Sequence, residues 1–268
     1  MTSDATHMFD SALTDEQRFP LITPAGIELL RHLEQHPHAP RYNYRVGDRL
    51  TAEYLDDLRR FAGELRLQRS GWRHGELPDW LVRYVELCLR EAPFYRRYAE
   101  QAEDFFRLPT LDRESIRRAP WEFVPDSRPL EDLVVYTTSG TTGTALRLPS
   151  HPIAPAKYLP LFEFALAAHG VQLVADRKVL LLHVCAQLET YCFPSVMSYF
   201  DSAGFAKVNL LPHAWRELDD RTSFLNDCDP ALITGDPVAL VELASMSVKI
   251  RPQAIISSGA ALLPAAGQ

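Results

Sequence analysis

The feature that most constrains the fold is an alternation of short apolar runs and longer helical patterns that begins near residue 133. The apolar runs predict strands at residues 133–137, 178–183, 206–210, 231–234 and 254–257. The patterns between them predict helices at residues 154–169, 193–202, 217–226 and 236–244. Such alternation is typical of parallel βαβ units, whose sheets bind ligands beyond the carboxyl ends of their strands. We therefore predict an α/β fold with a mainly parallel sheet.

The first 130 residues predict a helical region instead. Thr23 and Pro24 are typical of the start of a helix. Apolar residues at helical spacing continue over residues 51–65 and 78–90, and Pro93 breaks the pattern. We accordingly divide the chain into a helical N-terminal region, residues 1–130, and an α/β region, residues 131–268.

Composition excludes several classes of protein. The net charge is −7 and no basic stripe with interleaved aromatics occurs, so we expect no nucleic-acid partner. No apolar run is long enough to span a membrane, and the N-terminus lacks the pattern of a signal peptide. The four cysteines show no Cys-x2-Cys spacing, so we expect no metal site and no disulfide framework. A cytoplasmic protein is expected.

One loop carries the functional interpretation. Residues 137–143 form an unbroken Thr-Thr-Ser-Gly-Thr-Thr-Gly run that follows a predicted strand, with a hairpin return predicted at residues 145–148. Glycines allow close backbone approach, and successive N–H groups with hydroxyls can bind the phosphates of a nucleotide. The alternative is a hydroxyl-rich turn between two strands. Neither a Walker loop nor a Gly-x-Ser-x-Gly nucleophile motif is present, so nothing supports an unrelated hydrolase or transferase.

The loop resembles the phosphate loop of the adenylate-forming superfamily, which includes acyl-CoA synthetases. Residues 92–98, 108–113 and 123–126 are similar to segments of its phenylacetate–CoA ligase branch, and residues 233–237 and 255–262 to segments around its adenine site. The similarity spans roughly residues 80–268 and implies part of the family's large N-terminal domain, to which both regions of this chain would belong.

The resemblance implies a reaction, its cofactors and its site. A carboxylic acid, aryl acids being the branch's default, attacks ATP with Mg²⁺ present, and the acyl group of the resulting adenylate passes to a thiol such as coenzyme A. The implied site residues are Thr138, Ser139, Gly140, Thr141, Thr142 and Gly143 for phosphate, Ser258, Gly259, Ala260 and Ala261 for adenine, and His183 and Tyr191 for the acyl group.

Two departures from the family pattern matter. Thr144 follows Gly143 where the family has a lysine, and Arg147 is the candidate substitute. The family's metal-binding glutamate and the catalytic lysine of its small lid domain would lie beyond Gln268, so no catalytic residue is assigned.

Alternatives remain open for single residues and for the whole chain. His183 can be a strand-end histidine bonded to backbone, Tyr191 a core aromatic, and Asp236 a helix cap rather than a nucleotide contact. Ser258 and Gly259 equally suit a tight strand-to-helix turn. The chain itself can be a truncated or degenerate homologue that binds nucleotide or a partner without turnover. A homodimer or a complementary C-terminal polypeptide are the candidate partners.

Overall fold

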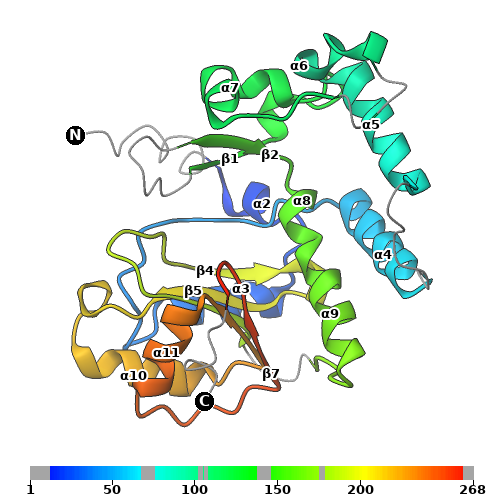
Figure 1. The fold of residues 1–268 in the computed structure, drawn as a ribbon. Helices are drawn as coiled ribbons and strands as arrows, with labels where there is room; N and C mark the ends of the chain where they lie inside the picture. The colour runs from blue at the N-terminus through cyan, green and yellow to red at the C-terminus, as the bar shows by residue number, and fades with distance from the viewer. Residues whose placement is uncertain are drawn as a thin grey trace. The chain divides into compact units, whose positions relative to one another are not determined.

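The chain folds into two compact units in the computed structural model. The structure describes residues 13–67, 76–101, 105, 108–137, 146–174 and 179–261. The first, which we name the sheet unit, comprises Met1–Leu65 and Ala156–Gln268, and the second, the hairpin unit, comprises Arg66–Pro155. Figure 1 shows the helices and strands of both units.

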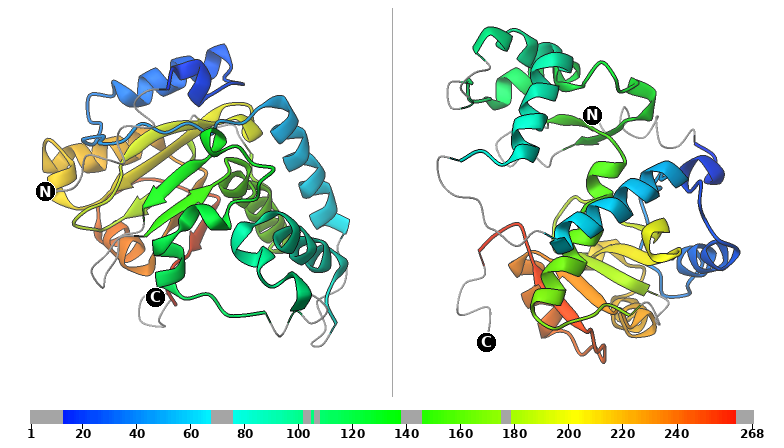
Figure 2. Two further views of the ribbon diagram at one scale, coloured as in Figure 1. Left: turned by 90° about the horizontal axis from the view of Figure 1, so that it is seen from above. Right: turned by 90° about the vertical axis from the view of Figure 1, so that its right-hand side faces the viewer.

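A five-stranded sheet organises the sheet unit (Figures 1 and 2). In spatial order its strands are β4 (Phe193–Met197), β5 (Ala203–Asn209), β3 (Val179–Cys185), β6 (Leu232–Gly235) and β7 (Ala254–Ser257). The β5–β3, β3–β6 and β6–β7 pairs are parallel, and only β4 runs antiparallel to its neighbour. The prediction of an α/β fold with a mainly parallel sheet is confirmed.

Helices cover both faces of this sheet. Helix α9 (Tyr158–Ala168) packs on one face, and α10 (Leu218–Cys228) and α11 (Pro237–Ser245) pack on the other. The unit also contains α2 (Asp15–Arg18), α3 (Pro24–Glu34), most of α4 (Ala52–Leu67), and the 3₁₀ turns η5 (Ser198–Phe200) and η6 (Pro212–Ala214). The short α8 (Ile153–Ala156) ends at the boundary between the two units. The single helix predicted at residues 154–169 is therefore two, which meet at Lys157.

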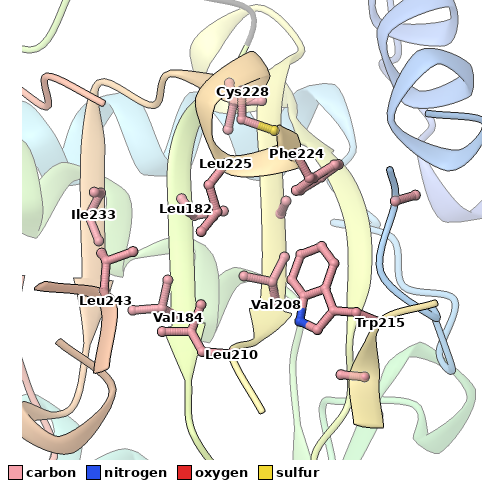
Figure 3. Packing of buried hydrophobic residues seen from close by; sticks show 14 of the residues in the cluster. Leu182, Val184, Val208, Leu210, Trp215, Phe224, Leu225, Cys228, Ile233 and Leu243 are labelled. Atoms are coloured by element: carbon pink, nitrogen blue, oxygen red, sulfur yellow. The ribbon is translucent and has the colours of Figure 1, made fainter. Parts of the chain in front are cut away.

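The two faces of the sheet carry separate apolar clusters. On one face Leu182 and Val184 of β3 and Val208 of β5 pack with Phe224 and Leu225 of α10 (Figure 3). On the other face Leu181 of β3 and Leu232 of β6 pack with Leu166 of α9. Because side chains alternate along a strand, residues 181, 183 and 185 of β3 belong to the α9 face, and 182 and 184 to the α10 face.

Local sequence signals start these helices where they were predicted. The Thr23 hydroxyl accepts a hydrogen bond from the Gly26 N–H at the start of α3. The Asp236 carboxylate accepts one from the Ala239 N–H at the start of α11, 2.9 Å away. Each side chain pairs one of the N–H groups that a helix start leaves without an intrahelical partner, so the cap reading of Asp236 is confirmed.

The helix predicted at residues 193–202 is wrong. Phe193–Met197 is instead the edge strand β4, followed by the turn η5 and by Asp201 and Ser202 with φ of 50° and 65°. Pro194 fits this position because an edge strand has one side without ladder hydrogen bonds. Asp48 fixes the corner, since its carboxylate accepts a hydrogen bond from the Ser198 N–H at 2.8 Å.

The hairpin unit contains short helices and a two-stranded antiparallel sheet. Its elements are α5 (Asp79–Glu91), α6 (Pro93–Arg96), η1 (Ala99–Gln101), α7 (Arg113–Arg118), η3 (Pro120–Phe123), η4 (Leu130–Asp132), β1 (Val134–Thr137) and β2 (Arg147–Ser150). Phe94 stacks on Phe123 with ring centroids 4.5 Å apart, which joins α6 to η3. The β1–β2 pairing confirms the predicted strand and its hairpin return (Figure 2).

None of the helices in the described ranges combines the length and the apolar character that crossing a bilayer requires.

Candidate functional site

The carboxyl ends of β3 and β6 are the place where this sheet favours a ligand. After β3 the chain continues to β4 and β5 on one side of the sheet, whereas after β6 it continues to β7 on the other. The segments that leave these neighbouring strands therefore diverge. Open α/β sheets bind ligands at such a reversal of strand order, beyond the carboxyl ends of the strands.

A row of paired residues crosses all five strands near this edge. Phe193 of β4 pairs with Lys207 of β5, Lys207 with His183 of β3, His183 with Thr234 of β6, and Thr234 with Ile256 of β7. Directly paired residues point to the same face of a sheet, here the face that α9 covers further down the strands. The row thus places a lysine, a histidine and a threonine side by side between apolar residues.

His183 is held in its neutral form by this setting. Its Nδ1 lies 2.9 Å from the Thr234 Oγ1, within a hydrogen bond. The pKa of His183 is lowered to about 4, mainly by burial and also by the nearby Lys207 ammonium, while Asp236 partly opposes the shift. A neutral imidazole can donate or accept a hydrogen bond near pH 7. The predicted bond to backbone at this histidine is replaced by a bond to a threonine hydroxyl.

Two buried thiols lie close to Lys207 and are unreactive in character. Burial raises the pKa of the Cys185 thiol, and it raises the pKa of Cys192 to about 11, although Lys207 pulls both values down. A thiol attacks as the thiolate, so neither is a nucleophile at neutral pH.

The segment after β7 contacts the end of β6. The Ser258 N–H donates to the Gly235 carbonyl at 2.9 Å. Gly259 has φ of +85°, and a Cβ placed on it would lie 3.9 Å from the Asp236 Cβ. The predicted adenine residues Ser258, Gly259, Ala260 and Ala261 are all exposed here. These small residues lie at the carboxyl edge of the sheet, and Ser258 comes two residues after Ile256, the β7 residue in the row of His183 and Thr234.

Tyr191 lies in the segment between β3 and β4, at the aromatic end of the row. Its ring centroid is 4.6 Å from that of Tyr44, which is also 5.8 Å from Phe193. The Asn43 amide fixes this segment, since it donates to the Thr190 carbonyl and accepts from the Cys192 N–H. The structure therefore joins Tyr191 through Tyr44 to Phe193, the residue that begins the row containing His183.

The predicted phosphate residues Thr138, Ser139, Gly140, Thr141, Thr142 and Gly143 lie outside the described residues. The structure describes the two strands that flank that loop, β1 and β2 of the hairpin unit. Thr137, the last residue of β1, pairs with Arg147, the first residue of β2. The exposed Arg147, the candidate substitute for the missing lysine, thus stands directly at the base of the loop.

Across residues 13–67, 76–101, 105, 108–137, 146–174 and 179–261, no group of three or more His, Cys, Asp or Glu side chains is arranged to hold a metal ion.

Two members of the row, Lys207 and Thr234, were missed by the sequence analysis. A signal for Lys207 was present, because it stands between Ala206 and Val208, which are fully buried. A lysine between two buried positions of a strand points to the opposite face. Its partners could not be identified without the register of the sheet.

Comparisons with known proteins add no identification. No protein-family model matches the chain, and searches of curated proteins and of solved structures found no significant match.

Proposed function

We propose that this chain binds ATP and serves the activation of a carboxylic acid to an acyl-adenylate, whose acyl group then passes to a thiol such as coenzyme A. The observation that carries the proposal is the Thr138–Gly143 run of hydroxyls and glycines, placed between the two strands of a hairpin. Successive N–H groups and hydroxyls in such a loop suit phosphate oxygens. Arg147 at its base supplies a cation in place of the missing lysine.

The carboxyl edge of the five-stranded sheet supports the proposed binding of adenine and of the acid. Ser258–Ala261 would lie against adenine, because small residues and a glycine with φ of +85° let a planar ring approach the backbone. His183 and Tyr191 would face the acyl group of the acid. The mainly parallel sheet is compatible with part of the large domain of a phenylacetate–CoA ligase-like enzyme, and that relationship belongs to the proposal.

Mg²⁺ would offset phosphate charge in this chemistry. Since the described residues offer no cluster of ligands for it, no step is assigned to the metal here.

The proposal is tested by calorimetric titration of the full chain with ATP. The variant S139A/T141A/T142A removes three hydroxyls from the loop, so we expect its affinity to fall at least about tenfold, the loss of several phosphate hydrogen bonds. Ser245→Ala, which removes an exposed hydroxyl from α11, is the control and should bind as the wild type does. Equal affinity of the triple variant would remove the loop from the site.

A second function is favoured by one observation. Thr144 stands where the resemblance leads us to expect a lysine, which fits a homologue that binds nucleotide without turnover. Pyrophosphate exchange, measured over a panel of carboxylic acids with a lid domain supplied in trans, separates the two. Exchange that depends on an added acid supports the ligase, whereas ATP binding without exchange supports the non-catalytic homologue.

A further inference from the structure

Lys207 is a lysine on a sheet face, two residues before the carboxyl end of β5. It is half-buried, and its neighbours Ala206 and Val208 are fully buried on the opposite face. Within the described ranges no carboxylate lies within ion-pair distance of its ammonium group. A partly desolvated charge normally has a partner, so the position suits a ligand that brings a negative charge.

The groups around Lys207 define what such a ligand would look like. Its paired neighbours are the Phe193 ring on one side and the neutral His183 on the other. Phe193 in turn contacts the rings of Phe205 and Tyr44, each with centroids 5.8 Å away. Aromatic rings favour a planar apolar body, and His183 offers it one further hydrogen bond. The setting fits an aromatic ring that ends in an anionic group.

Asp236, an acidic residue near the row, forms no ion pair with Lys207. Asp236 is close enough to His183 to influence its pKa. Its carboxylate, however, caps α11 by accepting the hydrogen bond from the Ala239 N–H. The carboxylate is thus held at the start of α11, and among the described residues Lys207 has no ion-pair partner.

The distance of Lys207 from the carboxyl edge of the sheet determines which end of a ligand can contact it. Lys207 lies two residues before Asn209, the last residue of β5, or about 7 Å from the strand end. Ser258 and Gly259 follow the end of β7, at the edge. A carboxylate that reacts at the edge would leave the opposite end of its molecule at Lys207.

We propose that Lys207 pairs with a second anionic group of the acid, at the end remote from the reacting carboxylate, so that the site selects an aromatic dicarboxylate. The assignment of the reacting end rests on the proposed function. Lys207 then acts as a specificity residue.

Direct binding of two matched probes tests this. The full chain is titrated by calorimetry with benzene-1,4-dicarboxylate and with benzoate, without nucleotide. We expect the wild type to bind the dicarboxylate at least about tenfold more tightly, as a charge-assisted hydrogen bond allows. Lys207→Met should abolish that preference, whereas Lys249→Met, at an exposed lysine, should keep it.

A charge-reversal variant distinguishes a loss of specificity from a loss of folding. Lys207→Glu should prefer 4-(aminomethyl)benzoate over the dicarboxylate, a gain that an unfolded chain cannot show, and circular dichroism checks its fold. Equal binding of both probes by the wild type, or an unchanged preference in Lys207→Met, would overturn the proposal. Loss of ATP binding with the Lys207-dependent preference intact would remove the proposed function alone.

Discussion

At the scale of single residues, the row at the carboxyl edge centres on His183, whose two polar neighbours are Thr234 and Lys207. His183 was predicted near the carboxyl edge because it ends an apolar run, and it lies there on β3. Its partners Thr234 and Lys207 come from residues 51 and 24 positions later in the chain. Only the register of β3 with β6 and β5 brings them together. Register depends on pairing across the whole sheet. Local sequence patterns therefore could not predict which residues form the row.

The neutral state of His183 leads to a pH dependence of stability. Its pKa falls from 6.5 to about 4 on folding, so between these values the unfolded chain binds a proton that the folded chain does not. The free energy of unfolding should therefore fall as pH is lowered from 6.5 to 4, with no contribution from this residue above that window. His183→Gln should make this slope shallower, as measured by urea denaturation at a series of pH values.

The pKa of half-buried Asp48 is raised and that of buried His36 is lowered. Both residues are present in wild type and variant, so the difference between the two proteins isolates His183. An identical slope in both proteins would contradict the neutral, partly buried imidazole. Its titration can be followed independently by the NMR resonance of the ring.

At the scale of elements, helices with strong end signals were predictable and the edge strand was not. Thr23 and Asp236 each marked a helix start that the structure confirms. Phe193–Met197 has an apolar pattern that suits either a helix or a strand, and its pairing with β5 decides for the strand. Short apolar runs are ambiguous in this way, and tertiary contacts such as the Asp48–Ser198 hydrogen bond settle them.

The close packing of β3 against β6 leaves no room for a side chain at Gly235. A Cβ on Gly235 would lie 2.8 Å from the Val184 Cγ2 and 2.9 Å from the Val184 carbonyl oxygen. Gly235→Ala should therefore lower the free energy of unfolding by about 1–3 kcal/mol, the usual cost of overpacking a core. Chemical denaturation measures this change.

Gly63 is the matched control for that substitution. It lies within α4, and a Cβ there would meet nothing within 4 Å. Gly63→Ala should raise the free energy of unfolding by about 0.5–1 kcal/mol, because alanine favours the helix over glycine. Similar effects at the two positions would contradict the close approach of β6 to β3.

At the scale of the whole molecule, alternation along the sequence predicted the class of fold but not its arrangement. Helix α10 lies between β5 and β6 and helix α11 between β6 and β7, as expected for parallel strands. Between β3 and β5, in contrast, the chain forms the antiparallel strand β4 where a helix was predicted. The insertion of β5 between β4 and β3 does not follow from the sequence, since nothing local distinguishes one strand order from another. The predicted sites likewise fall in different units, with residues 138–143 in the hairpin unit and Ser258–Ala261 in the sheet unit.

The central claim is that an adenine nucleotide binds at the carboxyl edge of the five-stranded sheet. Photolabelling of the full chain with 8-azido-ATP, followed by tryptic peptide mapping, tests it directly. Cleavage after Lys249 yields a peptide that contains Ser258–Ala261. We predict that this peptide carries the label and that excess ATP suppresses it. Label confined to other peptides, or label that excess ATP leaves unchanged, would contradict the account.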